Sequence, residues 1–152
     1  MDNNDILKSL RYTFDFNDTT MIEIFGLGGM SVTRAEVSDW LKKDTDPEFK
    51  NINDESLARY LNGLIVHRRG EKGEVPAPEQ QLNNNIVFRK LKIALNLRDE
   101  DILKILGKVG REISKHELSA FFRKPDQRQY RPCGDQILRN FLQGLQLTFR
   151  GD

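Results

Sequence analysis

The stretch Tyr60–Leu64 reads YLNGL, and 81 residues later Phe141–Leu145 reads FLQGL. Both stretches lie inside a pattern with helical periodicity, where a glycine costs roughly 1 kcal/mol relative to alanine. The same cost at the same place in both stretches indicates that another backbone approaches there, so that a Cβ atom would clash. The alternative is that the glycine bends the helix or ends it early. We expect close backbone packing at Gly63 and Gly144.

These two stretches belong to a duplication that covers most of the chain. A shift of 81 residues aligns Asn3–Gly70 with Asn84–Gly151 without a gap, and 17 of the 68 aligned positions are identical. Between the copies, residues 71–83 read EKGEVPAPEQQLN, a stretch with two prolines, one glycine and four charges that is typical of an exposed linker. The sequence therefore predicts one helical repeat over residues 1–70 and a second over residues 84–152.

Each repeat contains four helix signals, and no stretch of useful length alternates with the period of two that is typical of a strand. Asn4 is the expected cap of the first helix, and the second helix is expected to run from Asp18 to Gly26 in one copy and from Asp99 to Gly107 in the other. The third helix begins at the capping boxes TRAE (33–36) and SKHE (114–117). The fourth helix is expected to run from Asp54 to Arg69 and from Asp135 to Arg150. We expect an all-α protein of two tandem four-helix repeats, packed with pseudo-two-fold symmetry.

The composition of the chain is that of a globular protein. Of its 152 residues, 38% are hydrophobic and 31% are charged, and the net charge is +1. The sequence contains no run of about 18 apolar residues, so it predicts no membrane span. The polar, acidic start MDNNDILKSL is unlike a signal peptide. The single Cys133 has no partner for an internal disulfide. These observations predict a cytoplasmic protein with no membrane association.

The reactive residues of the chain do not form a recognisable catalytic pattern. Three acidic positions occur in both copies, and each is explained as a helix cap or capping-box partner: Asp18 with Asp99, Glu36 with Glu117, and Asp54 with Asp135. His67 and His116 do not correspond and lack metal-ligand spacing, and Cys133 replaces Ile52 and is expected in the core. We expect no catalytic residue, metal or cofactor; an enzyme whose site the sequence conceals stays an alternative.

Charge is divided unevenly between the copies. Residues 1–70 hold nine basic and twelve acidic residues, a charge of −3, whereas residues 84–152 hold fourteen and eight, a charge of +6. After the third helix the first copy reads DTDPEFKNIND (44–54) and the second reads PDQRQYRPCGD (125–135). A basic loop with an aromatic ring can bind phosphate and stack a base. Alternatively, Tyr130 is a core residue, or the opposite charges dock one copy on the other.

The second copy therefore supplies the candidate nucleic-acid-binding residues. These are Arg89, Lys92, Arg123, Lys124, Arg128, Tyr130 and Arg131. Two of them, Arg123 and Lys124, are also explained by the favourable interaction of cations with the end of a helix. The segment Ile102–Phe122 superficially resembles a helix-turn-helix, but six residues separate Gly107 from Ser114, where a compact turn takes three or four.

The NN at the head of each copy and the segment CGDQILRNFLQGL (Cys133–Leu145) resemble the YehS-like family of bacterial cytoplasmic proteins. The resemblance covers essentially the whole chain and implies two copies of a domain of unknown function and a bacterial source, but it implies no activity. We expect a non-catalytic binding or regulatory protein, with nucleic acid as the favoured ligand. The alternative partner is a protein helix bound in a groove between the repeats.

Overall fold

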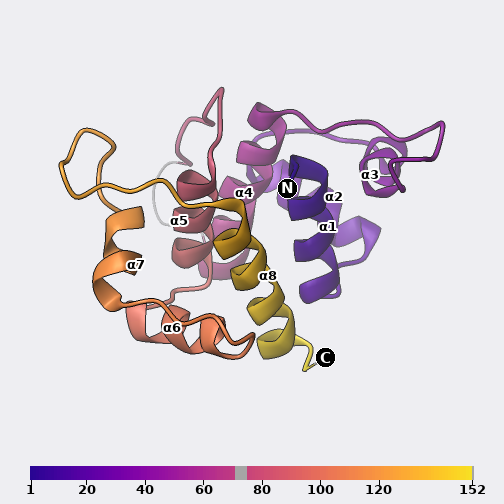
Figure 1. Cartoon of the computed structure of the whole chain (residues 1–152). Coiled ribbons are helices and arrows are strands. Elements are labelled where there is room, and N and C mark those ends of the chain that lie inside the picture. Colours follow the sequence, from indigo (N-terminus) through magenta and orange to yellow (C-terminus); the bar gives the residue numbers. More distant parts are fainter. Residues whose placement is uncertain (71–74, 152) are drawn as a thin grey trace.

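A computed structural model describes residues 1–70 and 75–151. The described residues form eight helices and no strand (Figure 1). Their bounds are α1 (Asn3–Thr13), α2 (Asp18–Leu27), α3 (Arg34–Leu41) and α4 (Asp54–Arg69) in the first copy, and α5 (Asn84–Ala94), α6 (Asp99–Gly107), α7 (Lys115–Phe121) and α8 (Asp135–Phe149) in the second. The expected all-α fold of two four-helix repeats is confirmed. Residues 71–74 of the predicted linker lie outside the described residues.

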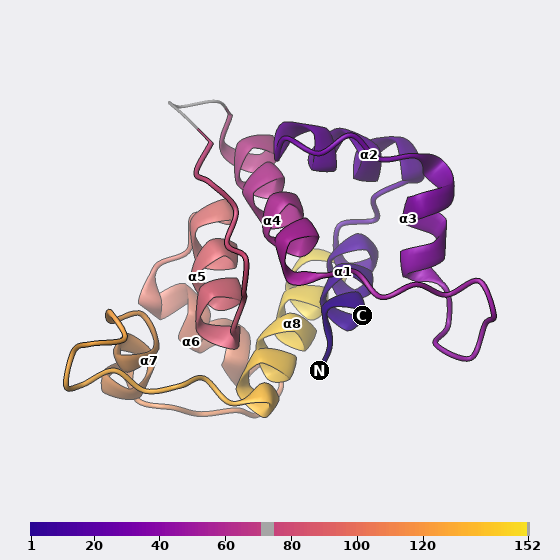
Figure 2. The ribbon, with the colours of Figure 1, turned by 90° about the horizontal axis from the view of Figure 1, so that it is seen from above.

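The first and last helices of the two copies make up the centre of the molecule. Figure 2 shows α1, α4, α5 and α8 in the middle, with α2 and α3 on one side and α6 and α7 on the other. The α4–α5 and α1–α8 contacts are more extensive than the α1–α4 and α5–α8 contacts. The first helix of each copy therefore packs mainly on the last helix of the opposite copy, which is the pseudo-two-fold arrangement expected from the duplication.

The four central helices run in the same direction. Near their first residues, α4 and α5 are joined by Leu82 N to Asp54 Oδ2 (2.8 Å), α1 and α8 by Met1 N to Asp135 Oδ2 (3.3 Å), and α1 and α4 by Asn3 to Asp54 Oδ1 (2.7 Å). Near their last residues, Arg69 donates to the Ile93 carbonyl (3.2 Å) and Arg150 to the Tyr12 carbonyl (2.9 Å). Arg69 is the last residue of α4, and Arg150 directly follows the last residue of α8. Their guanidinium groups donate to backbone carbonyls at the end of the first helix of the opposite copy.

The glycines of YLNGL and FLQGL lie where two helices cross closely. A Cβ atom on Gly63 would overlap the Ile24 carbonyl oxygen of α2, and one on Gly144 would overlap the Ile105 carbonyl oxygen of α6. By contrast, no atom lies within 4 Å of a Cβ placed on Gly26, and α2 continues one residue beyond it. The prediction of close backbone packing is confirmed, and the glycine in α4 and α8 permits the crossing.

Several helix caps differ from the prediction. The cap of α1 is Asp2, whose side chain accepts from the Asp5 amide at 2.8 Å, and not Asn4. Four aspartates expected as caps are the first residues inside their helices, and the caps are the residues before them: Asn17, Arg98, Asn53 and Gly134. A carboxylate is favourable in the first turn of a helix as well as at its cap, so the sequence signal is displaced by one residue. The two predicted capping boxes are confirmed.

Asn4 has a different role, because its side chain is buried. Its amide group donates to the carbonyls of Trp40 (2.9 Å) and Lys50 (2.8 Å), and its oxygen accepts from the Ile52 amide (3.1 Å). The equivalent Asn85 makes the same three bonds in the second copy, to Phe121 (3.1 Å), Arg131 (2.9 Å) and Cys133 (2.9 Å). These two asparagines fasten the loop before the last helix of each copy to the first helix of that copy.

The interface between α4 and α5 contains a buried lysine. Lys90 is 7% exposed, and its Nζ lies 2.6 Å from Asn62 Oδ1 and 3.1 Å from a Glu79 carboxylate oxygen. Asn62 also donates to the Pro76 carbonyl at 3.2 Å. The described part of the predicted linker thus packs on this interface. The equivalent of Lys90 in α1 is Ser9, so the two inter-copy interfaces differ here.

Candidate nucleic-acid interface

Each copy has a surface hollow between its first helix and the loop that leads into its last helix. We call the one in the first copy the acidic hollow; it measures about 410 Å³ and is lined by Asp2, Asn4, Asp5, Lys8, Lys43, Asp44, Thr45 and Phe49. We call the one in the second copy the basic hollow; it measures about 110 Å³ and is lined by Asn83, Asn85, Ile86, Arg89, Phe121, Arg123, Pro125 and Tyr130. The two hollows share several equivalent lining positions, so they are related by the duplication.

The loops beside the hollows have the same backbone turns. Equivalent bonds close these turns: Asp46 N to the Lys43 carbonyl (2.9 Å) and Phe49 N to the Asp46 carbonyl (3.0 Å) in the first copy, and Gln127 N to the Lys124 carbonyl (2.9 Å) and Tyr130 N to the Gln127 carbonyl (3.1 Å) in the second. Phe49 and Tyr130 are therefore held at the same place, each half-buried beside its first helix. The difference between the hollows lies in the side chains.

Three carboxylates of the acidic hollow have no counterpart in the basic hollow. The positions of Asp2, Asp5 and Asp44 are occupied in the second copy by Asn83, Ile86 and Pro125. In the first copy the Nζ of Lys8 lies 5.4 Å from the centre of the Phe49 ring. The corresponding residues of the basic hollow are Arg89 and Tyr130, with no carboxylate among the lining side chains.

Arg123 has an unused hydrogen-bond donor. In the first copy the equivalent Lys42 bonds Asp39 at 2.6 Å, and this hydrogen bond raises the pKa of Lys42. In the second copy the position of Asp39 is Ala120. The Nε atom of Arg123 is buried and has no hydrogen-bond partner within residues 1–70 and 75–151. Buried donors are normally paired, so the unpaired Nε distinguishes Arg123 from Lys42, which has Asp39 as its partner.

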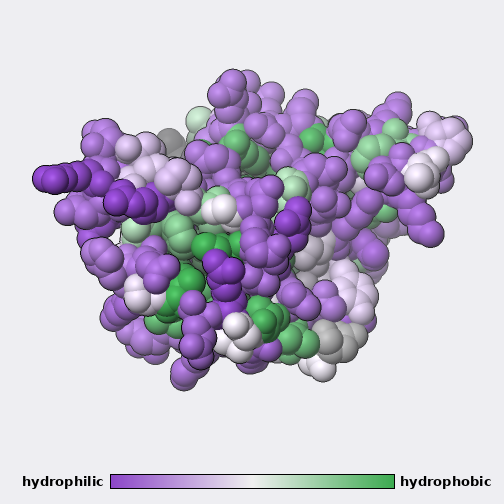
Figure 3. Space-filling view, viewed as in Figure 1, coloured by the Kyte–Doolittle hydropathy of each residue, from purple (hydrophilic) through white to green (hydrophobic). Residues whose placement is uncertain are grey.

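The other candidate residues fall into two groups. Lys124, Arg128 and Arg131 are exposed on the loop between α7 and α8, over which Figure 3 shows protruding hydrophilic side chains. Arg131 donates to two carbonyls of this loop, those of Arg128 (3.3 Å) and Tyr130 (2.9 Å). Lys92 is not among the residues that line the basic hollow.

Lys92 is held by contacts of its own. Its Nζ lies 2.9 Å from an oxygen of Asp99 and 4.4 Å from the centre of the Phe122 ring. The structure thus brings Arg89, Arg123 and Tyr130 together and keeps Lys92 in an ion pair. Sequence reasoning did not select Asn85 or Phe121 for the hollow, although the NN at the head of each copy was a signal for the former.

The single cysteine of the chain is a side chain of the hydrophobic core. Cys133 is 5% exposed, and burial raises the pKa of its thiol to about 11, so it is a neutral core side chain at pH 7, as expected. The described residues contain no group of three or more potential metal ligands. None of the helices described is both long enough and apolar enough to span a bilayer.

Two copies of one helical unit, joined through their first and last helices, define an all-α tandem-repeat protein. The model of a family of proteins of unknown function, DUF1456, matches residues 3–70 and again residues 84–151. The chain therefore belongs to this family. It is 42% identical over 144 residues to the uncharacterized protein YehS of Escherichia coli (strain K12), in an alignment that covers 93% of this chain and 92% of that protein. No solved structure matches the chain.

Proposed function

We propose that this protein is a non-catalytic, cytoplasmic nucleic-acid-binding protein that takes a single-stranded segment into its basic hollow. In this proposal the guanidinium groups of Arg89 and Arg123 bind phosphate, and the ring of Tyr130 stacks on a base. The observation that carries the proposal is the reversal of charge between two hollows that share one backbone. Asp2 and Asp5 also form the capping box of α1, whereas the neutral Asn83 caps α5, so the second copy keeps a helix cap at this place without a carboxylate in its hollow.

Two features support a single strand over a duplex. An aromatic ring can stack only on a base that is not already paired and stacked in a helix. The candidate helix-turn-helix also departs from the usual geometry, because α7 contains only seven residues and begins eight residues after α6 ends. Lys124, Arg128 and Arg131 would then contact neighbouring phosphates along the strand, which accounts for a basic loop beside the hollow.

The proposal is tested by titrating the full chain with a fluorescent thymidine oligonucleotide, a uridine oligonucleotide and a short duplex. We expect the single strands to bind more tightly and the affinity to fall between about 50 mM and about 200 mM salt, because phosphate contacts release counterions. The double variant Arg89→Ala with Arg123→Ala should bind at least about tenfold more weakly, which corresponds to about 1.4 kcal/mol.

The matched control lies in the acidic hollow. The double variant Lys8→Ala with Lys43→Ala removes two cations from the equivalent hollow and should leave the affinity unchanged. The absence of binding at low salt, an affinity that does not change with salt, or an equal loss in the control variant would each contradict the proposal.

A further inference from the structure

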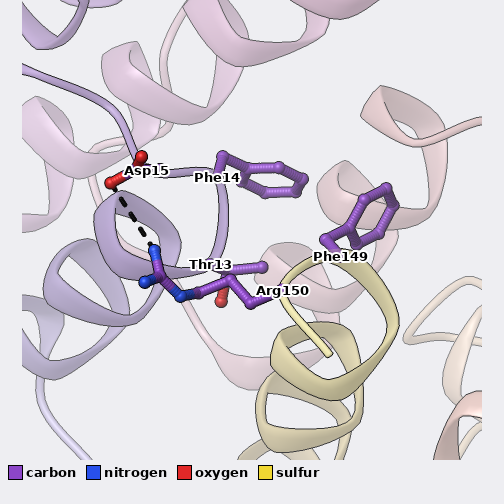
Figure 4. Close-up of a pocket in the computed structure, with 5 residues that line it drawn as sticks. All are labelled: Thr13, Phe14, Asp15, Phe149 and Arg150. Carbon is purple, nitrogen blue, oxygen red and sulfur yellow. Dashed lines mark ion pairs between the residues drawn. The ribbon is translucent and has the colours of Figure 1, made fainter. Parts of the chain in front are cut away.

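A third hollow, with different chemistry, lies at the end of the central bundle where α1 and α8 finish. It measures about 370 Å³ and is lined by Thr13, Phe14, Asp15, Phe149 and Arg150. Figure 4 shows the two phenylalanine rings on one side and the Arg150 guanidinium directed at Asp15 on the other. The lining residues come from both copies, so this hollow exists only because the end of α1 lies beside the end of α8.

Aromatic side chains form an exposed apolar patch at this end. The rings of Phe14 and Phe149 have their centres 4.9 Å apart, and Phe149 is 41% exposed. Tyr12 and Ile93, at the ends of α1 and α5, are 39% and 40% exposed. Among the described residues, four large hydrophobic side chains are exposed, and Tyr12, Ile93 and Phe149 are three of them. Exposed apolar side chains gathered at one end of a molecule can mark a site of protein contact.

The side chain of an arginine lies on this patch. The guanidinium of Arg68, in the last turn of α4, lies 5.2 Å from the centre of the Phe14 ring and 5.6 Å from that of Phe149. Its side chain is exposed, and no carboxylate of residues 1–70 or 75–151 forms an ion pair with it. A guanidinium held on aromatic rings keeps its outward donors for a planar anion such as a carboxylate.

We propose that this end of the bundle, defined by Phe14, Arg68, Phe149 and Arg150, docks an acidic peptide segment of a partner protein. An aromatic or branched apolar side chain of the peptide enters the hollow beside Phe14 and Phe149, and a neighbouring carboxylate binds Arg68. This surface is separate from the basic hollow, so the inference stands independently of the nucleic-acid proposal.

The chemistry of the hollow favours a peptide over a polyphosphate strand. The carboxylate of Asp15 lines the hollow and its side chain is 90% exposed, so it would repel a run of phosphates more strongly than a peptide with a single carboxylate at Arg68. The rings of Phe14 and Phe149 are tilted by 56° against each other, so together they leave no pair of parallel faces between which a base could stack. An apolar side chain with one adjacent carboxylate avoids both difficulties.

The test selects a phage-displayed random peptide library on the immobilised full chain and subtracts phage that also bind the Arg68→Ala, Phe149→Ala double variant. We expect the enriched peptides to combine Phe, Leu or Trp with neighbouring Asp or Glu. An enriched peptide, synthesised with a fluorescent label, should bind each single variant about tenfold more weakly than the unaltered chain. Arg139→Ala, an exposed arginine near the opposite end of α8, is the matched control and should bind normally.

Arg68 and Phe149 are both exposed, so the variants should fold, and thermal melting of each variant checks this. No enrichment, enrichment of basic peptides, or an equal loss with Arg139→Ala would overturn the proposal. It would also be overturned if Arg68→Ala weakened binding of the thymidine oligonucleotide and left peptide binding intact.

Discussion

The acidic and basic hollows are the most informative pair of regions in the molecule. Both lie between the first helix of a copy and the loop before its last helix, and both loops are held by a buried asparagine, Asn4 or Asn85. The backbone is thus the same, while three carboxylates line one hollow and none lines the other. The comparison shows that a duplicated scaffold can keep its internal bonds and present opposite charge at equivalent places.

The two hollows also differ in size, at about 410 Å³ and about 110 Å³. Arg123 and Phe121 line the smaller one, whereas the equivalent Lys42 and Trp40 do not line the larger one. Lys42 is drawn to Asp39 by an ion pair that the second copy lacks. In the second copy Ala120 stands in place of Asp39, so Arg123 has no such partner at this position.

The largest expected effect tests whether the two scaffolds are built in the same way. Gly63→Ala should lower the free energy of unfolding by about 3 kcal/mol, because the new Cβ overlaps the Ile24 backbone and α2 and α4 must separate. Gly144→Ala should have a similar effect through Ile105. Urea denaturation measures both changes.

The control for these variants is Gly26→Ala, since open space surrounds that position in α2. It should raise the free energy of unfolding by up to about 1 kcal/mol, because alanine is the better helix former. If Gly63→Ala were as stable as Gly26→Ala, the close crossing would not exist.

A smaller effect is expected from the two buried asparagines. Asn4→Ala and Asn85→Ala each leave one amide and two carbonyls without their partner, which should cost about 2 kcal/mol in either copy. The measurement is again urea denaturation, with Asn51→Ala, an exposed residue, as control. A loss in one copy only would show that the two loops are held differently, and the comparison of the hollows would fail.

The smallest expected effect changes the charge of one hollow and leaves its fold intact. Ile86→Asp introduces the carboxylate that Asp5 supplies at the equivalent place in the acidic hollow. We expect oligonucleotide affinity to fall about tenfold, because a negative charge beside Arg89 and Arg123 opposes phosphate binding. Ile86→Asn has nearly the same shape without the charge and should bind much more tightly than Ile86→Asp. Equal affinities for the two variants would exclude a charge effect.

Local sequence signals predicted the helices well, but they did not predict contacts between residues that are distant in sequence. The capping boxes at Thr33 and Ser114 and the glycines of α4 and α8 are short-range patterns, and each was confirmed. The role of Asn4 was predicted wrongly because its bonds reach residues 36 to 48 positions away. The pairing of first with last helices across the copies is likewise a property of the assembled chain. The exact limits of the repeats, 1–70 and 84–152, stay a prediction.

The sequence predicted some residues of the candidate site but did not predict their ion-pair partners. Arg89 and Arg123 were selected as basic positions of the more basic copy, and Tyr130 was selected because Arg128 and Arg131 flank it in the loop 125–135. The sequence could not show that Lys92 turns to Asp99 on the next helix. The sequence shows where along the chain the charged residues lie, but which of them form an ion pair depends on how the helices pack.

The most direct test of the account is a chemical-shift titration of the isotope-labelled chain with a thymidine oligonucleotide. We predict that the amide signals of Arg89, Arg123 and Tyr130 move at low salt and return as salt is added, while those of Lys8 and Phe49 stay in place. Equal movement in both hollows, or movement that salt does not reverse, would contradict the claim that the duplicated scaffold binds phosphate only where its carboxylates are absent.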